Sequence, residues 1–156
     1  MLFVSVAFFA SSSALAQAKD EWQIFKDTFH KEKKEIVNEY MKLSPDQAAK
    51  FWPLYEEYNQ SRGVIGKGRL EIIDDYAGQL STLSDSQADD LAKRLFKNDE
   101  ALLDLDKKYY SKISKAIGGV KAAQYLQLEQ YFATNIKSTI QEHIPFIGEI
   151  ERASGH

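Results

Sequence analysis

The chain has 156 residues, of which 44% are hydrophobic and 28% are charged, the balance of one ordinary soluble domain. Its formal net charge is -3 and the two signs are interspersed, so it lacks the basic patch that nucleic-acid binders carry, and no nucleic-acid partner is expected. The sequence contains no cysteine, which excludes disulfides and thiolate metal sites.

Residues 1–16 differ from the rest of the chain because none of them is charged. An apolar run is followed by serines and then by Ala14 and Ala16, the small-x-small pattern that precedes a signal-peptidase cleavage site. The run is shorter than the roughly 20 apolar residues that span a bilayer, although no Lys or Arg precedes it. We expect a secretory signal peptide cleaved near Ala16 and an exported mature chain, residues 17–156, without stable membrane insertion. A retained membrane anchor is the alternative.

Residues 17–156 are expected to fold as a single all-α domain, because glycine and proline are scarce and no strand-like alternation of apolar and polar residues occurs. Helices are predicted over residues 20–42, 44–80, 84–116 and 119–143. The joint between the second and the third is short, so these two helices should form an antiparallel hairpin, each roughly 50 Å long at 1.5 Å per residue. The predicted fold is four helices built round this long hairpin, with an elongated or curved shape.

The second predicted helix contains the aromatic run FWPLYEEYN. Phe51, Tyr55 and Tyr58 are spaced i, i+4, i+7 and should lie on one helix face, in the core. Trp52 projects about 100° away from Phe51, so part of it should be exposed. The proline in this run and three glycines further along predict a bend or local fraying, because both residue types are unfavourable in a helix interior.

A short motif occurs twice, at the predicted starts of the second and third helices. It reads L-S-x-x-Q followed by Ala, and its fixed residues are Leu43, Ser44, Gln47, Leu83, Ser84 and Gln87. The pattern is typical of a capping box, in which the Ser side chain accepts a hydrogen bond from the Gln N–H and the Gln side chain accepts one from the Ser N–H. The preceding Leu can pack over the first turn as a hydrophobic staple. We interpret both copies as helix starts rather than as ligand contacts.

The paired motifs also resemble those of the periplasmic Spy/CpxP family, whose members are named for an LTxxQ motif, although Ser stands in place of Thr in both copies here. The segments AAKFWPLYEEYN, AAQYLQLEQ and IPF resemble a branch of related exported proteins, so the resemblance spans most of the mature chain. It implies a periplasmic location and a fold built on a helical hairpin, often as an antiparallel homodimer.

By this resemblance, the chain would be an ATP-independent chaperone or envelope-stress adaptor that binds unfolded or misfolded envelope proteins. The alternatives are an inhibitory regulatory partner of a sensor kinase and a metal-responsive periplasmic protein, and the sequence leaves these open. A surface that combines apolar and basic groups suits unfolded clients. The candidate client-binding residues are Phe25, Phe29, Lys31, Lys33, Lys34 and Trp52. The other interpretation of these residues is a core aromatic face beside a solvated surface on which neighbouring acids neutralise the lysines.

Motifs that would indicate catalysis are not found in the sequence. No G-x-S-x-G, phosphate-binding loop or haem motif occurs. Adjacent acids such as Glu56 and Glu57 project about 100° apart on a helix and do not form a general acid/base pair. His30, His143 and His156 are isolated from one another in the sequence, so no preformed metal site is predicted. We expect a protein that is not an enzyme and that needs no cofactor.

Overall fold

The computed structural model of the chain describes residues 32–141 and Ile144. The chain divides into two compact units, Met1–Lys42 and Leu43–His156. In the first unit, residues 32–41 are helical, and Val37 and Met41 are fully buried. The predicted signal peptide and the earlier part of the first predicted helix lie outside the described residues.

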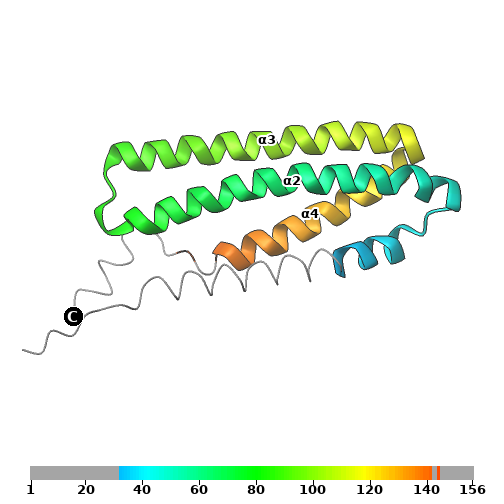
Figure 1. Ribbon diagram of the computed structural model, residues 1–156, viewed down its shortest axis with the longest axis horizontal. Coiled ribbons are helices and arrows are strands. Elements are labelled where there is room, and N and C mark those ends of the chain that lie inside the picture. Colours follow the sequence, from blue (N-terminus) through cyan, green and yellow to red (C-terminus); the bar gives the residue numbers. More distant parts are fainter. Residues whose placement is uncertain (1–31, 142–143, 145–156) are drawn as a thin grey trace, which may run out of the picture. The chain divides into compact units, whose positions relative to one another are not determined.

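Three long helices make up the described part of the second unit (Figure 1). Helix α2 spans Pro45–Gln79, a short 3-10 turn spans Leu80–Thr82, α3 spans Asp85–Ile117 and α4 spans Gly119–Gln141. Helices α2 and α3 lie antiparallel, and α4 packs against α3 and crosses the hairpin obliquely. The described residues contain no strand, and the prediction of an all-α fold built round a helical hairpin is confirmed. We call the end of the hairpin with the 3-10 turn the tip, and the opposite end the base.

Both hairpin helices begin with the capping box that the repeated motif predicts. At α2, the Ser44 hydroxyl accepts a hydrogen bond from the Gln47 N–H (3.3 Å), and Gln47 Oε1 accepts one from the Ser44 N–H (3.2 Å). The corresponding distances between Ser84 and Gln87 at α3 are 3.3 and 2.9 Å. Each box thus satisfies backbone donors that have no partner within the helix. The copies differ in their other hydrogen bonds: Gln47 Nε2 also donates to the Ile117 carbonyl (3.3 Å), whereas the Ser84 hydroxyl also donates to Gln87 Oε1 (2.8 Å).

Replacing either cap serine with alanine should lower the free energy of unfolding by about 1 kcal/mol, because the Gln N–H loses its acceptor. Ser44→Ala and Ser84→Ala can be measured by urea denaturation beside Ser86→Ala, which removes an exposed serine inside the first turn of α3 and serves as the control. The control should change stability by no more than about 0.5 kcal/mol. If the cap variants unfold like the control, the motif does not act through capping.

Polar side chains connect α2 to α3 along the hairpin. From base to tip, these contacts join Glu57 to Lys112 (3.2 Å) and Tyr109 (3.3 Å), Tyr58 to Asp106 (2.7 Å), the Ile65 carbonyl to Asn98 (2.9 Å), Arg69 to Asp99, and Asp75 to Arg94 (2.7 Å). Most of the charged partners are partly exposed, and an exposed ion pair is worth roughly 0–1 kcal/mol. We infer that these contacts fix the register of the two helices more than they stabilise them.

Buried apolar side chains are concentrated at the base of the hairpin. The buried apolar residues are Phe51, Tyr55, Tyr58 and Ile72 in α2, Leu91, Leu105, Tyr109, Ile113 and Ile117 in α3, and Ala122, Tyr125 and Phe132 in α4. Helix α4 has 23 residues against the 35 of α2, so it is too short to follow the whole hairpin. Toward the tip, the described residues of the hairpin bury Ile72 and Leu91 alone.

Helix α2 is a single helix, as predicted, through the segment where a bend or local fraying was expected. Pro53 and the glycines at positions 63, 66 and 68 all lie within its helical span. A contact from α3 supports the helix there, because Asn98 Nδ2 donates to the Ile65 carbonyl (2.9 Å). A Cβ atom on Gly68 would lie 3.4 Å from the same amide nitrogen, so the two helices approach closely at this point.

The turn between α3 and α4 depends on Gly118. Its φ is 94° and its ψ is 154°, a region that residues with a Cβ atom rarely adopt. The Gly118 N–H donates to the Ser114 carbonyl (3.0 Å), and its own carbonyl accepts from the Ala122 N–H (3.0 Å). A single residue therefore ends one helix and opens the next, which places the start of α4 beside the end of α3.

Candidate functional site

The sequence-based candidates for client binding have different environments in the structure. Three of the six lie outside the described residues: Phe25, Phe29 and Lys31. Of the others, Lys33 is 4% exposed, whereas Lys34 is exposed. Trp52 is half-buried, and its ring packs edge-on against Phe51 and Tyr55, with ring centroids 5.1 and 5.2 Å away. Lys33 is thus not available at the surface for a client, while Lys34 and part of Trp52 are.

Tyrosines fill the centre of the base. Tyr125 of α4 stands edge-on to Phe51, Tyr55 and Tyr58 of α2, and the ring centroids are 5.1, 6.0 and 6.1 Å away. Tyr58 in turn lies 5.5 Å from Tyr109 of α3. Edge-to-face pairs of this kind contribute about 0.5–1.5 kcal/mol beyond the burial of their area. The three helices of the second unit therefore meet through one connected set of rings.

Charged groups lie among these rings. The Tyr58 hydroxyl donates to Asp106 (2.7 Å) and accepts from Arg62 Nη1 (3.0 Å). Glu129 of α4 is 3% exposed. Burial lowers the pKa of Arg62, but the neighbouring Tyr58 and Glu129 outweigh burial, and the net shift of this pKa is upward. Arg62 therefore remains a cation within the base, where it offsets the buried acid.

The buried tyrosines are held in their neutral form. Burial raises the pKa of Tyr55, Tyr58 and Tyr125 above the ordinary value for a phenol, and the charge of Glu129 raises each of them further. A phenol that resists ionisation is neither a base nor a ready acid near neutral pH. The tyrosine cluster is therefore suited to holding the helices together rather than to proton transfer.

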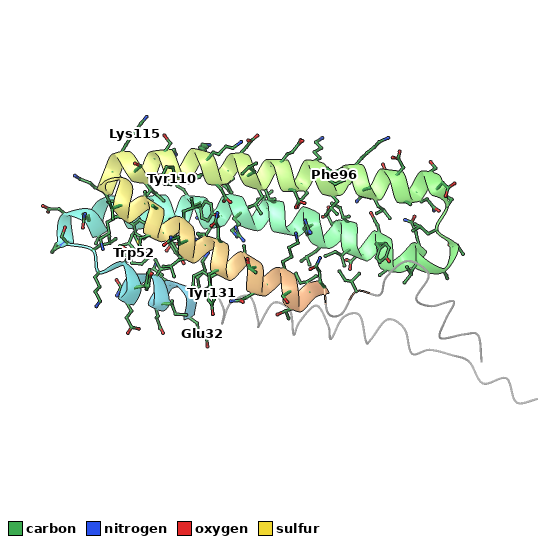
Figure 2. All side chains as sticks on the ribbon, turned by 180° about the vertical axis from the view of Figure 1, so that it is seen from behind. Glu32, Trp52, Phe96, Tyr110, Lys115 and Tyr131 are labelled. Carbon is green, nitrogen blue, oxygen red and sulfur yellow. The ribbon has the colours of Figure 1, made fainter. Side chains whose placement is uncertain are left out.

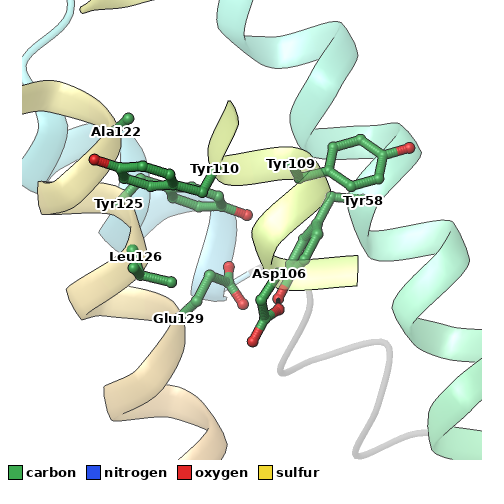
Figure 3. Close-up of a pocket in the computed structure, with 8 residues that line it drawn as sticks. All are labelled: Tyr58, Asp106, Tyr109, Tyr110, Ala122, Tyr125, Leu126 and Glu129. Carbon is green, nitrogen blue, oxygen red and sulfur yellow. Dashed lines mark hydrogen bonds between the residues drawn. The ribbon is translucent and has the colours of Figure 1, made fainter. Parts of the chain in front are cut away.

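A small pocket opens beside this cluster (Figure 3). Its lining includes four tyrosines and two acids, Tyr58, Tyr109, Tyr110, Tyr125, Asp106 and Glu129. It has room for roughly one water molecule. Sites for small organic ligands usually enclose about 300–1,000 Å³, so this pocket does not offer the space for a metabolite.

Apolar side chains form an exposed line on α3. Phe96, Leu103 and Tyr110 are spaced by seven residues, and their exposed fractions are 64%, 53% and 38%. Seven residues make nearly two helical turns, so the three side chains project from the same side of the helix over about 21 Å. Figure 2 labels the first and last of them, which lie well apart along α3. We call these three residues the α3 stripe.

Several of the charged residues near the α3 stripe are paired within the protein. The pairs are Lys93 with Asp89 (2.6 Å), Lys107 with Asp104 (3.4 Å), and Asp99 with Arg69. The stripe thus offers apolar contact beside charges of both signs, and Glu100, which lies between Phe96 and Leu103 on the helix, is exposed and is in none of these pairs. Exposed apolar side chains that line up in this way, unlike single scattered ones, mark a candidate interaction surface.

Metal-binding and membrane-spanning features are absent from the part of the chain that the structure describes. Within residues 32–141 and at Ile144, no three His, Asp or Glu side chains are grouped so that they could hold a metal ion. None of the helices described there is both long and apolar enough to cross a bilayer. His30, His143 and His156 lie outside the described residues.

Comparisons with known proteins give no match for this chain: no protein-family model, no curated protein and no solved structure matches it. The resemblance to the Spy/CpxP family thus stays a prediction from short motifs. Among the described residues, the α3 stripe is the exposed feature that offers most apolar contact to a partner.

Proposed function

We propose that this protein is an ATP-independent binding protein that holds exposed apolar segments of unfolded or misfolded proteins. The α3 stripe carries the proposal, since three apolar side chains remain exposed in line on a long helix that is otherwise rich in charge. Shallow apolar contacts hold many different sequences loosely, whereas recognition of one small ligand needs a shaped cavity. No nucleotide-binding motif occurs in the sequence, so the binding would not be coupled to ATP hydrolysis.

Two further observations support this function and a periplasmic location for it. Residues 1–16 have the composition of a secretory signal peptide. The L-S-x-x-Q repeats resemble those of the Spy/CpxP family, in which such binding proteins occur. Lys34 and the exposed part of Trp52 remain secondary candidates for contact with a client.

Residues 17–156 should slow the aggregation of several unrelated unfolding proteins without ATP. Replacing both Phe96 and Leu103 with serine should weaken the binding of clients by at least about tenfold, because each apolar side chain buried in a contact contributes roughly 1.5–3 kcal/mol when its burial is complete. Light scattering at stoichiometric ratios of protein to client measures the effect.

The matched control removes two other exposed apolar side chains, through Val64→Ser on α2 and Val120→Ser on α4, which are 74% and 85% exposed. This variant should suppress aggregation as well as the wild type does. If it loses as much activity as the stripe variant, or if neither variant loses activity, the α3 stripe is not the binding surface. No suppression for any client, combined with tight capture of one sensor-kinase domain, would assign the protein to the regulatory-partner class instead.

A further inference from the structure

We infer that residues 63–68 of α2 are a hinge, which lets the second half of this helix separate from α3 while α3 stays intact. This inference concerns the motion of the hairpin and does not depend on the proposed function. It starts from three glycines, Gly63, Gly66 and Gly68, that lie inside a helix of 35 residues. Each glycine favours the unwound chain over the helix by roughly two- to fivefold relative to alanine.

Packing does not require glycine at two of the three positions. A Cβ atom on Gly63 or Gly66 would meet nothing within 4 Å, and both residues are exposed. Gly118 is different, because its φ of 94° demands glycine. Alanine would therefore fit at positions 63 and 66 and would strengthen the helix. The glycines weaken α2 at a point where the fold itself would accept a stronger residue.

The hinge lies where the packing of α2 changes. On the base side, the aromatic residues of α2 contact Tyr125 of α4, as described above. On the tip side, the second half of α2 is joined to α3 by the partly exposed ion pairs Arg69–Asp99 and Asp75–Arg94 and buries Ile72 alone among the described residues. Exposed ion pairs hold helices weakly. In the described part of the chain, the glycine-rich stretch thus joins a half of α2 that buries three aromatic residues to a half that buries one residue.

Helix α3 provides the intact side of the hairpin. It contains no glycine between Asp85 and Ile117. At the hinge it contributes Asn98, whose side-chain amide donates to the Ile65 carbonyl between the glycines (2.9 Å). This contact holds the hinge in its helical form, and it has to break when the second half of α2 moves away. Opening would expose Ile72 and the α3 residue Leu91, which are buried in the closed hairpin.

Hydrogen exchange followed by mass spectrometry on the full chain tests the hinge. Backbone amides in residues 60–70 should exchange faster than those in residues 95–105 of α3. The double variant Gly63→Ala with Gly66→Ala should slow exchange in residues 60–70 by roughly tenfold, the product of two substitutions that each favour the helix two- to fivefold. Asn98→Ala should speed exchange in the same residues and leave residues 46–58 unchanged.

Gly78→Ala is the matched control, because Gly78 also lies in α2 and has nothing within 4 Å of its Cβ position. It strengthens the second half of the helix but not the hinge, so exchange in residues 60–70 should not change. If Gly78→Ala slows exchange there as much as the double variant does, the whole second half unwinds and there is no hinge. Equal protection of residues 60–70 and 95–105 in the wild type would also overturn the inference.

The separation of the helices can be measured independently, because the chain has no cysteine of its own. Spin labels on Glu71→Cys and Lys97→Cys, both at exposed positions, report the distance between the second half of α2 and α3. The wild-type chain should show a second, longer distance that the alanine double variant removes. A single distance in both chains would contradict the hinge.

Discussion

Tyr125→Ala is expected to lower the free energy of unfolding by about 3–5 kcal/mol, the usual cost of removing a buried aromatic side chain. Tyr125 is 3% exposed, and its ring is the contact through which α4 meets Phe51, Tyr55 and Tyr58. The substitution opens a cavity at the centre of the base and removes three ring pairs at once. A domain is usually stable by about 5–15 kcal/mol, so urea denaturation followed by circular dichroism should show a large loss.

Two controls separate the ring of Tyr125 from its hydroxyl and from a general tyrosine effect. Tyr125→Phe keeps the ring and removes the hydroxyl that lies beside the buried Glu129, so it should cost about 1–3 kcal/mol, less than Tyr125→Ala. Tyr131→Ala removes a side chain that is 63% exposed and should cost no more than about 0.5 kcal/mol. A Tyr125→Ala variant as stable as these controls would show that α4 is held by other contacts.

Raising the pH above 10 is expected to destabilise the fold steeply. Burial, followed by the charge of Glu129, raises the pKa of Tyr55, Tyr58 and Tyr125 in the folded chain, whereas the pKa of an unfolded tyrosine is about 10. Above pH 10 the unfolded chain therefore releases protons that the folded chain retains. The free energy of unfolding is therefore unaffected by the ionisation of these tyrosines below pH 10. Above pH 10 it falls by about 1.4 kcal/mol per pH unit for each tyrosine, or about 4 kcal/mol per unit for the three.

Urea denaturation at a series of pH values measures this slope, and the ultraviolet absorbance of the phenolate shows when the tyrosines ionise. Tyr125→Phe should reduce the slope by about a third, because one of three buried phenols no longer titrates. Tyr131→Phe changes an exposed tyrosine and should leave the slope as it is. If the buried tyrosines ionise with a pKa near 10 while the protein stays folded, the cluster is more open to water than its burial indicates.

The hairpin could be predicted from the sequence because its signals are local. Ser44 and Ser84 each satisfy the first turn of a helix, and such a cap acts over three residues. Gly118 ends α3 through its own backbone conformation. The support that α2 receives from Asn98 could not be predicted in this way, because Asn98 is 33 positions from its partner Ile65 in the chain. A glycine-rich stretch shows its weakness in the sequence but not the support that it receives from another helix.

The α3 stripe was not predicted, although its residues belong to a repeating pattern that is present in the sequence. Apolar doublets recur every seven residues in α3, as Leu95-Phe96, Leu102-Leu103 and Tyr109-Tyr110. In each doublet the first residue is the more buried and the second is exposed. Two adjacent residues differ by about 100° around a helix, and the periodicity of Leu91 and Ile113 places the first residue of each doublet, not the second, on the core face. Periodicity does not place the charged residues Lys33 and Glu129 in a core, although the structure buries both.

Three helix ends meet at the base, since Gln47 near the start of α2 contacts Ile117 at the end of α3, and α4 starts at Gly119. Aligned peptide dipoles give a helix start a partial positive charge and a helix end a partial negative one. The end of α3, which is partly negative, thus lies near the starts of α2 and α4, which are partly positive, and these neighbouring ends attract each other. The Gln47 amide strengthens this arrangement by donating to a carbonyl that has no partner within α3. Because an amide does not ionise, the junction keeps its polarity at any pH at which the protein is folded.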